Sequence, residues 1–288
     1  MKNIISYSSL PKFNLITPSS LKEALELLDQ YQNKARLLAG GTDLLIELRH
    51  RLIQPKVLIN LKMIPELQTI RITEQELKIG AVTPIIEVLT IPIIKEEYLA
   101  LYQSLADLAD EILRYRATIG GNIGTSSPAA DSAASLYVLD AKINISSLAK
   151  GQRTVPINEF FTGVKRNLLT SDEIITSISI PRPKKGSRSS FKKMKRSSED
   201  LALVGVACFH NEKKTCLSYT AMAPTPLLID ITDNIVRERK ELDEAKFRDI
   251  WDVITPILRP IDDIRASKKY RMHMAEMVTR TILKEVLE

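Results

Sequence analysis

The chain has few of the residues that bind metals or form disulfides. Its 288 residues include two cysteines, Cys208 and Cys216, and three histidines. The cysteines form neither a C-x-x-C pair nor a disulfide framework, so we expect two small apolar side chains in a reduced, cytoplasmic setting. An iron–sulfur cluster needs four ligands, and His50, His210 and His273 lack metal-ligand spacing. The sequence therefore predicts no metal site in this chain.

Long apolar runs are also missing. The longest apolar stretches, such as LALVGVACF at 201–209, are too short to cross a bilayer. Residues 1–14 lack the apolar core and small-residue cleavage site of a secretory signal. Hydrophobic residues at 44% and charged residues at 26% are typical of a soluble globular protein. We expect no direct membrane insertion.

The formal net charge of +6 comes from one segment. Residues 182–196, RPKKGSRSSFKKMKR, hold eight Lys or Arg and no acid, whereas 33 basic side chains accompany 35 acidic ones in the rest of the chain. A surface that binds nucleic acid along its length is typically a broad basic stripe with interleaved aromatic residues. We therefore expect no nucleic-acid partner. The segment is either a solvated loop and strand face or a local recognition site.

The order of predicted elements indicates an α+β fold in two domains. Strands are expected at 13–18, 36–40, 57–60, 69–73, 77–82, 142–148 and 172–181, and helices at 19–31, just after Pro84, within 95–113 and from Asp131 or Ser132 to about Ala141. Ser20 and Glu23 have the spacing of a capping box. After a boundary at 180/181, the predicted elements are a three-stranded antiparallel sheet (189–196, 201–210, 215–224) and helices at about 241–254 and 267–287.

Glycine is scarce, and half of it lies at two points. Gly40–Gly41 lies in RLLAGGTDLLIELR (36–49), and three of the ten glycines lie in RATIGGNIGTSSPAADSAASL (116–136). Neither segment is a G-x-G-x-x-G or a G-x-x-x-x-G-K-[ST] motif. A strand that runs into a glycine pair exposes successive backbone N–H groups, which can bind an anion without a lysine. One pair alone is usually a tight turn, but two pairs with similar flanks favour ligand binding.

Polar side chains accompany both glycine pairs. Thr42 follows the first, and Asn122, Thr125, Ser126 and Ser127 follow the second. If the two segments converge, amide and hydroxyl donors alone could hold a diphosphate. Further along, Asp131 has two interpretations. It is either the N-cap of the helix that begins there or a carboxylate that accepts hydrogen bonds from ligand hydroxyls.

The segments LLAGGTDLL and TIGGNIGTSSPAADSAASL, about 80 residues apart, resemble the two signature segments of the FAD-binding (medium) subunit of the molybdenum hydroxylases. This is the family of xanthine dehydrogenase, carbon monoxide dehydrogenase and aldehyde oxidoreductase. FNLITPSSLKEALELL, SSFKKMKRSSEDLALVGVA and DIRASKKYRMHMAEMVTRTIL extend the resemblance over nearly the whole chain. It implies a vanillyl-alcohol-oxidase (PCMH)-type FAD-binding domain of two α/β subdomains, about 1–55 and 56–180, and a C-terminal domain at 181–288.

The resemblance also implies a set of FAD-binding residues. They are Leu38, Ala39, Gly40, Gly41, Thr42, Asp43, Leu44 and Leu45 in the first diphosphate segment, Thr118, Ile119, Gly120, Gly121 and Asn122 in the second, Asp131 at the hydroxylated chain of the flavin, and Ile175 and Lys192 near the isoalloxazine ring. A cation there would stabilise a negatively charged reduced ring. Alternatively, Lys192 is one solvated lysine among many on an exposed strand.

The implied function is an oxidoreductase subunit that relays electrons. FAD in this chain would receive electrons from a partner's [2Fe–2S] cluster and pass them to NAD⁺, a quinone or oxygen. The implied partners are a molybdopterin-binding large subunit and a [2Fe–2S] small subunit, which alone would hold the molybdopterin and the clusters. No catalytic residue toward the organic substrate is expected here. Two alternatives stay open: a stand-alone FAD-dependent oxidoreductase of the same superfold, and a non-enzymatic nucleotide- or nucleic-acid-binding adaptor that uses residues 182–196.

Overall fold

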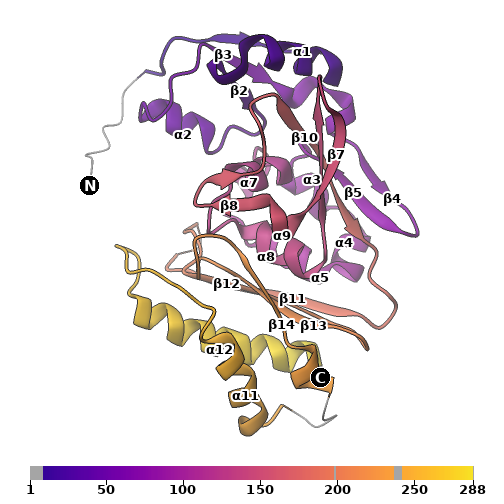
Figure 1. The fold of residues 1–288 in the computed structure, drawn as a ribbon, viewed down its shortest axis with the longest axis vertical. Helices are drawn as coiled ribbons and strands as arrows, with labels where there is room; N and C mark the ends of the chain where they lie inside the picture. The colour runs from indigo at the N-terminus through magenta and orange to yellow at the C-terminus, as the bar shows by residue number, and fades with distance from the viewer. Residues whose placement is uncertain (1–8, 198, 237–241, 288) are drawn as a thin grey trace.

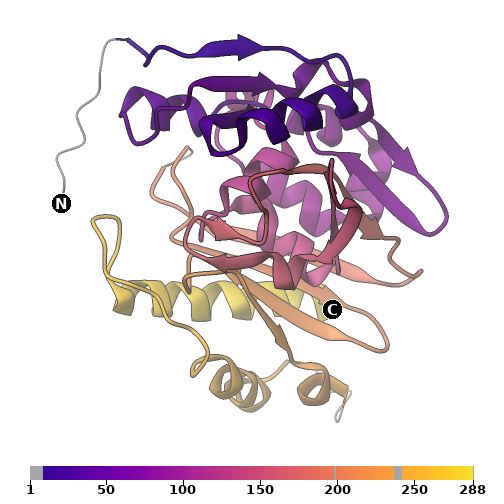
Figure 2. The same cartoon turned by 45° about the horizontal axis from the view of Figure 1, so that its top comes forward.

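The computed structural model describes residues 9–197, 199–236 and 242–287. The fold is α+β, as expected, and its parts follow one another in chain order (Figure 1). A small parallel sheet lies at the top of the view, a larger antiparallel sheet with its helices lies in the middle, and the C-terminal sheet and helices lie at the bottom. Figure 2 shows the same succession from a second direction.

The first sheet is parallel, with the order β1 (Asn14–Ile16), β3 (Val57–Asn60), β2 (Ala35–Leu38). Helix α1 (Leu21–Tyr31) connects β1 to a 3₁₀ turn (Gln32–Lys34) and β2, and α2 (Leu44–Arg49) lies between β2 and β3. The central strand of this sheet comes last in the sequence, and helices α1 and α2 lie in the crossover connections that parallel strands need. The expected subdomain division at 55/56 therefore separates β3 from its own sheet, and the first subdomain extends at least to Asn60.

Helix α1 begins where the capping residues predict. The Ser20 hydroxyl accepts a hydrogen bond from the Glu23 N–H at 3.2 Å, and the Glu23 carboxylate accepts one from the Ser19 N–H at 2.7 Å. The return bond thus reaches one residue further back than in the usual capping box. The helix buries Ala24, Leu25 and Leu28, which belong to the core that also contains the first sheet.

The second sheet is antiparallel. Its strands, in spatial order, are β4 (Ile70–Ile72), β5 (Glu76–Gly80), β10 (Glu173–Pro181), β6 (Lys142–Ser147) and β7 (Gly151–Pro156). The helices of this subdomain are α3 (Ile85–Leu89), α4 (Pro92–Glu97), α5 (Leu99–Ala106), α6 (Glu111–Arg114), α7 (Ile119–Thr125) and α8 (Asp131–Val138), with short 3₁₀ turns at Leu61–Met63 and Pro65–Leu67. β7 and the small elements α9 (Ile157–Phe160), β8 (Phe161–Gly163) and β9 (Arg166–Asn167) were not predicted.

The predicted helix at 95–113 is three helices. The chain leaves helical geometry between α4 and α5 at Tyr98, whose φ and ψ are −122° and 47°. It leaves it again after α5, where Ala109 has a φ of 43°. The apolar pattern does not show the first break, because side chains on both sides of Tyr98 remain buried in one core. Beyond the second break, α6 has no buried residue.

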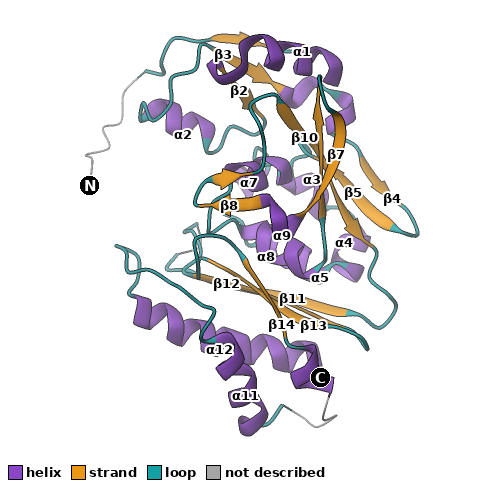
Figure 3. Ribbon diagram, viewed as in Figure 1, coloured by secondary structure: helices purple, strands orange, loops and turns teal. Residues whose placement is uncertain are grey.

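The C-terminal sheet has the order β11 (Arg188–Met194), β12 (Val204–His210), β13 (Thr215–Thr220), β14 (Leu227–Asp230). The fourth strand extends the three that the sequence predicts, and its four residues are too few for a recognisable period. α10 (Thr232–Val236), α11 (Glu244–Ile254) and α12 (Lys268–Leu287) follow. Strand and helix assignments are coloured in Figure 3.

The C-terminal sheet is buried on both faces. Ala207 and Phe209 of β12 join the core around the second sheet, whereas Val206 and Cys208 join a second core with α11 and α12. Helices α5 and α8 pack on one face of the sheet and α12 packs on the other. Successive residues of a strand point to opposite faces, so this one strand contributes to both cores. A continuous apolar contact therefore joins the two parts of the chain.

Both cysteines are buried free thiols, as expected. Burial raises the pKa of Cys208 well above its ordinary value and that of Cys216 to about 12. These thiols therefore stay neutral at physiological pH and pack as small apolar groups. None of the helices in the described ranges is both long and apolar enough to span a membrane.

An ion pair between a buried carboxylate and a partly exposed arginine gives the second subdomain a testable pH dependence. Arg153 donates to both carboxylate oxygens of Glu173, at 2.7 and 2.8 Å, and the Thr170 N–H donates at 2.9 Å. These bonds, with Arg153 as the largest contributor, lower the pKa of Glu173 from 4.5 to about 2. The stabilisation they provide is therefore complete above pH 4.5 and is lost as the pH falls toward 2.

We expect Glu173→Gln to lower the free energy of unfolding by about 1–3 kcal/mol at pH 7. Urea unfolding of both proteins at pH 7 and at about pH 3.5 measures the effect. The difference between the variant and the natural sequence should shrink at the lower pH, because Glu173 of the unfolded chain is then largely protonated while that of the folded protein is still ionised. An equal difference at both pH values would show that the ion pair does not carry the stabilisation.

Candidate cofactor-binding site

The first glycine segment leaves the carboxyl end of the parallel sheet, just after β2. Gly41 has a φ of +81°, in the left-handed region that favours glycine. Gly40 packs directly on the backbone of the second subdomain, since a Cβ there would lie 1.9 Å from the carbonyl oxygen of Arg116. The two glycines are therefore required for different reasons, a turn and a close backbone approach. Neither reason involves a ligand.

The backbone amides of this segment form a row of donors. Leu45 N–H donates to the Gly41 carbonyl at 3.0 Å, which closes the turn into α2. In the described part of the chain, the N–H groups of residues 40–44 donate to no protein acceptor. Asp43 at the start of α2 makes no capping hydrogen bond with its side chain. Successive free N–H groups of this kind bind anions.

The second glycine segment is the first turn of helix α7 and not a loop after a strand, which differs from the expectation. The Thr118 hydroxyl caps the helix by accepting from Gly121 N–H at 3.0 Å. Gly120 N–H donates to the Ala81 carbonyl at 3.0 Å, and a Cβ at Gly120 would lie 2.5 Å from that oxygen. These amides therefore have partners within the protein. The expectation that the backbone N–H groups of a glycine pair are free for an anion therefore holds for the first pair and not for Gly120 and Gly121.

The two segments nevertheless converge. A Cβ at Gly121 would lie 4.0 Å from the Ala39 Cβ, with the Thr118 hydroxyl at 2.9 Å as its one closer neighbour. Burial raises the pKa of Asp43 above its ordinary value. Lys165 and a hydrogen bond with Thr125 of α7 offset part of this shift. The first segment and α7 thus lie against each other, and Gly121 keeps the space between them free of a side chain.

The expected hydroxyl donors serve the protein itself. Thr125 Oγ1 donates to the Gly121 carbonyl at 2.9 Å, and Ser126 Oγ donates to the Ile123 carbonyl at 3.1 Å. Ser127 Oγ accepts from Ala129 N–H. These three hydroxyls order the turn between α7 and α8. The idea that hydroxyls complete the anion site is therefore not supported by their contacts.

The remaining predicted site residues surround these segments. Asn122 Oδ1 accepts from the Ser132 hydroxyl at 2.7 Å, which ties α7 to α8. Ile175 of β10 is buried at 7% exposure and lies beside Gly124, where a Cβ would be 3.7 Å from its Cδ1. Leu38 and Ile119 are core residues, Leu45 is 39% exposed, and Ala39, Thr42 and Leu44 are half-buried.

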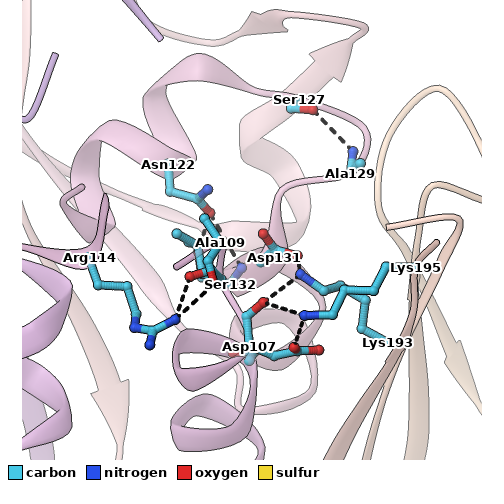
Figure 4. A network of polar contacts seen from close by, with 12 residues as sticks. Asp107, Ala109, Arg114, Asn122, Ser127, Ala129, Asp131, Ser132, Lys193 and Lys195 are labelled. Carbon is cyan, nitrogen blue, oxygen red and sulfur yellow. Dashed lines mark hydrogen bonds and ion pairs between the residues drawn. The ribbon is translucent and has the colours of Figure 1, made fainter. Parts of the chain in front are cut away.

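Asp131 lies at the centre of a polar network that joins the two domains (Figure 4). Its carboxylate pairs with Lys193 Nζ at 2.8 Å, and the two side chains are 7% and 0% exposed. Lys193 also donates to the Asp107 carbonyl at 2.7 Å, and Lys195 pairs with the Asp107 carboxylate. Burial raises the pKa of Asp131, and Lys193 opposes this shift. The N-cap of α8 is Ala130, so the N-cap interpretation of Asp131 is wrong.

Arg114 stabilises the turn that positions this network. Its guanidinium donates to the Leu108 and Ala109 carbonyls at 2.9 and 3.0 Å, as Figure 4 shows for Ala109. The contact holds the positive-φ turn that follows Asp107. Asp107 is thereby placed where both Lys193 and Lys195 reach it.

Lys192 and Lys193 point to opposite faces of β11. Lys192 Nζ pairs with Glu285 of α12 at 2.6 Å and is 35% exposed. The structure thus brings Lys193 to Asp131 and does not bring Lys192 there. The alternation of side chains along a strand predicts this difference. Phe191 lies on the same face of β11 as Lys193, and Phe191 belongs to the core around the second sheet.

Lys62 and Arg116 also border the first segment, and the sequence reading missed both. Lys62 Nζ donates to the Ala39 carbonyl at 3.2 Å. The available signal is the topology of the parallel sheet. Lys62 follows β3 just as Gly40 follows β2, and the carboxyl ends of neighbouring parallel strands share one edge.

A groove of about 700 Å³ adjoins the polar network at Asp107 and Lys193. It lies among α5, β11 and α12, and Asp107 and Lys193 contribute to its wall. The apolar part of the lining comes from Tyr102, Phe191, Met194, Met274, Met277 and Val278. An apolar surface thus borders the network where the two domains meet.

Comparison with known proteins places these features in a family context. Residues 11–183 match the model of a family described as the FAD binding domain in molybdopterin dehydrogenase, and residues 189–286 match the CO dehydrogenase flavoprotein C-terminal domain. The carbon monoxide dehydrogenase medium chain of Hydrogenophaga pseudoflava is 32% identical over 94% of this chain and 96% of its own length. The nicotinate dehydrogenase FAD-subunit of Eubacterium barkeri is 37% identical over 67% of each chain.

Solved structures agree with these matches. Carbon monoxide dehydrogenase from H. pseudoflava superposes with a TM-score of 0.88 at 30% identity, over 96% of this chain and 98% of that chain. Quinoline 2-oxidoreductase from Pseudomonas putida 86 gives the same TM-score at 26% identity, over 97% of this chain and 98% of that chain. The similarity therefore covers both domains.

Proposed function

Because this chain belongs to the family of FAD-binding subunits of molybdopterin dehydrogenases, we propose that it binds FAD between its two glycine segments and relays electrons within a multi-subunit oxidoreductase. The observation that carries the proposal is the row of free amides at residues 40–44, in a segment that approaches the side-chain-free surface at Gly121 through Ala39. A diphosphate needs such donors and such space. The residues present thus fit the cofactor that the family binds.

The roles of the chain's own residues follow from their positions. The amides of residues 40–44 would bind the diphosphate, and Gly121 would leave room for it. Asp131 would accept hydrogen bonds from the hydroxylated chain, with Lys193 holding its carboxylate in place. Ile175 would present an apolar surface toward the ring. When bound, FAD exchanges electrons one or two at a time, so it can link a one-electron donor to a two-electron acceptor.

Partner subunits would hold the other redox groups. Two cysteines cannot supply the four ligands of an iron–sulfur cluster. We therefore assign the [2Fe–2S] clusters to a small subunit and the molybdopterin to a large one, with NAD⁺, a quinone or oxygen as the terminal acceptor. The relatives named above are the medium chain and the FAD-subunit of dehydrogenases. We place the complex in the cytoplasm and the domain boundary at 180/181, just before the last residue of β10.

We expect the purified full chain to carry non-covalent FAD. The visible absorption spectrum of the protein, and of the flavin released by denaturation, measures this. A chain that stays colourless after incubation with FAD would contradict the proposal and favour the adaptor alternative.

Purification from the native source tests the partners. We expect a molybdopterin subunit and a [2Fe–2S] subunit to accompany the chain. An isolated chain that oxidises an organic substrate by itself would instead support the stand-alone oxidoreductase.

A further inference from the structure

The edge of the parallel sheet carries a pair of cations beside the free amides. Lys62 is half-buried and holds its ammonium group 3.2 Å from the carbonyl oxygen of Ala39. The backbone of Arg116 lies against the same segment, since a Cβ added at Gly40 would lie 1.9 Å from the Arg116 carbonyl oxygen. The pKa of Lys62 is lowered by burial and, next, by the positive charge of Arg116. The two cations are thus close enough to repel each other.

Among the described residues, no carboxylate pairs with either of these cations. Neither Lys62 nor Arg116 forms an ion pair with any residue in the described ranges. Glu47 of α2, the nearest acid along the segment after Asp43, pairs with Lys165 at 2.8 Å. Burial raises the pKa of Asp43, and the positive charge of Lys165 offsets part of this shift. Both carboxylates of the segment therefore interact with Lys165.

Like charges that lie close together without a counter-ion cost free energy unless an anion joins them. At this edge the anion would also meet the N–H groups of residues 40–44. We propose that Lys62 and Arg116 neutralise the two negative charges of the cofactor's diphosphate, so that charge as well as backbone amides determines affinity at this site. This inference rests on the proposed FAD function. It adds two residues to the site, and it makes binding depend on ionic strength.

Flavin fluorescence titrations of the full chain test the proposal. Lys62→Met and Arg116→Met each remove one charge and keep an unbranched side chain. We expect each to raise the dissociation constant of FAD about 5- to 30-fold. Lys62→Arg, which keeps the charge, should stay within about threefold of the natural sequence. Lys184→Met, in the turn between β10 and β11, is the control and should leave the dissociation constant unchanged.

Salt provides the second readout. Raising NaCl from about 0.05 to 0.5 M shortens the screening length severalfold. It should weaken FAD binding to the natural sequence more than binding to the Lys62→Met/Arg116→Met double variant. Thermal melting of each variant confirms that it is folded, and Arg116, which is exposed, provides a variant with little structural risk.

The possible outcomes distinguish the charge assignment of Lys62 and Arg116 from the proposed function. If the natural sequence binds FAD and both Met variants bind it equally well, the charge assignment is wrong and the proposed function stands. If Lys62→Arg binds as weakly as Lys62→Met, the lysine acts by holding the Ala39 carbonyl, which also overturns the assignment. If the natural sequence binds no FAD, both the proposed function and this inference fall.

Discussion

Gly121→Val is expected to lower the FAD affinity of the full chain at least about a hundredfold while the protein stays folded. The added methyl groups would project into the space between α7 and Ala39, where the diphosphate is proposed to lie. The backbone of Gly121 is compatible with other residues, since its φ is not positive and its one close neighbour is the Thr118 hydroxyl at 2.9 Å. Equilibrium titration with FAD, together with a urea unfolding curve, measures both effects.

Two other glycines provide the matched controls. Gly163→Val should change neither affinity nor stability much, because its nearest atoms would be 3.9 Å from an added Cβ. Gly40→Ala should instead destabilise the fold by about 3 kcal/mol or more, since its Cβ would overlap the Arg116 carbonyl oxygen. If Gly121→Val binds FAD like the natural sequence, the space beside α7 does not hold the cofactor.

Lys193→Met is expected to destabilise the protein by about 3–5 kcal/mol. The substitution leaves the carboxylate of Asp131 buried between the two domains without its counter-ion. It also removes the hydrogen bond to the Asp107 carbonyl. Because breaking one side of a buried ion pair costs more than replacing both partners, Asp131→Asn/Lys193→Met should recover most of the lost stability.

A double-mutant cycle in urea measures this coupling, and FAD titration of the same proteins separates structure from binding. The double variant should be nearly as stable as the natural sequence and should still bind FAD more weakly, because the carboxylate proposed to accept the flavin hydroxyls is gone. Additive losses of stability would show that the pair is not coupled. Full FAD affinity in the double variant would remove Asp131 from the site.

The sequence predicts the parts of the site that depend on glycine. The clustering of five of the ten glycines at two points identifies the segments that the fold brings together. Its physical basis is only partly the expected one. Gly40 and Gly120 admit neighbouring backbone, Gly41 admits a positive φ, and Gly121 alone faces the proposed ligand space. The clustering of glycine thus predicts that side chains are excluded at these positions, but it does not show whether backbone, a turn or a ligand excludes them.

The residues that the sequence reading missed depend on pairing between distant strands and domains. Lys62 reaches the first segment because β3 is parallel to β2, and Lys193 reaches Asp131 because β11 packs against the helices of the other domain. A basic run such as 182–196 does not show which of its lysines become buried. Three of its lysines, Lys192, Lys193 and Lys195, and two of its arginines, Arg182 and Arg196, form ion pairs.

The crystal structure of the full chain with FAD tests the central claim most directly. We predict the diphosphate within hydrogen-bonding distance of the amides of residues 40–44, between them and Gly121. A diphosphate bound elsewhere on the protein, or a first segment whose amides face away from it, would contradict the account.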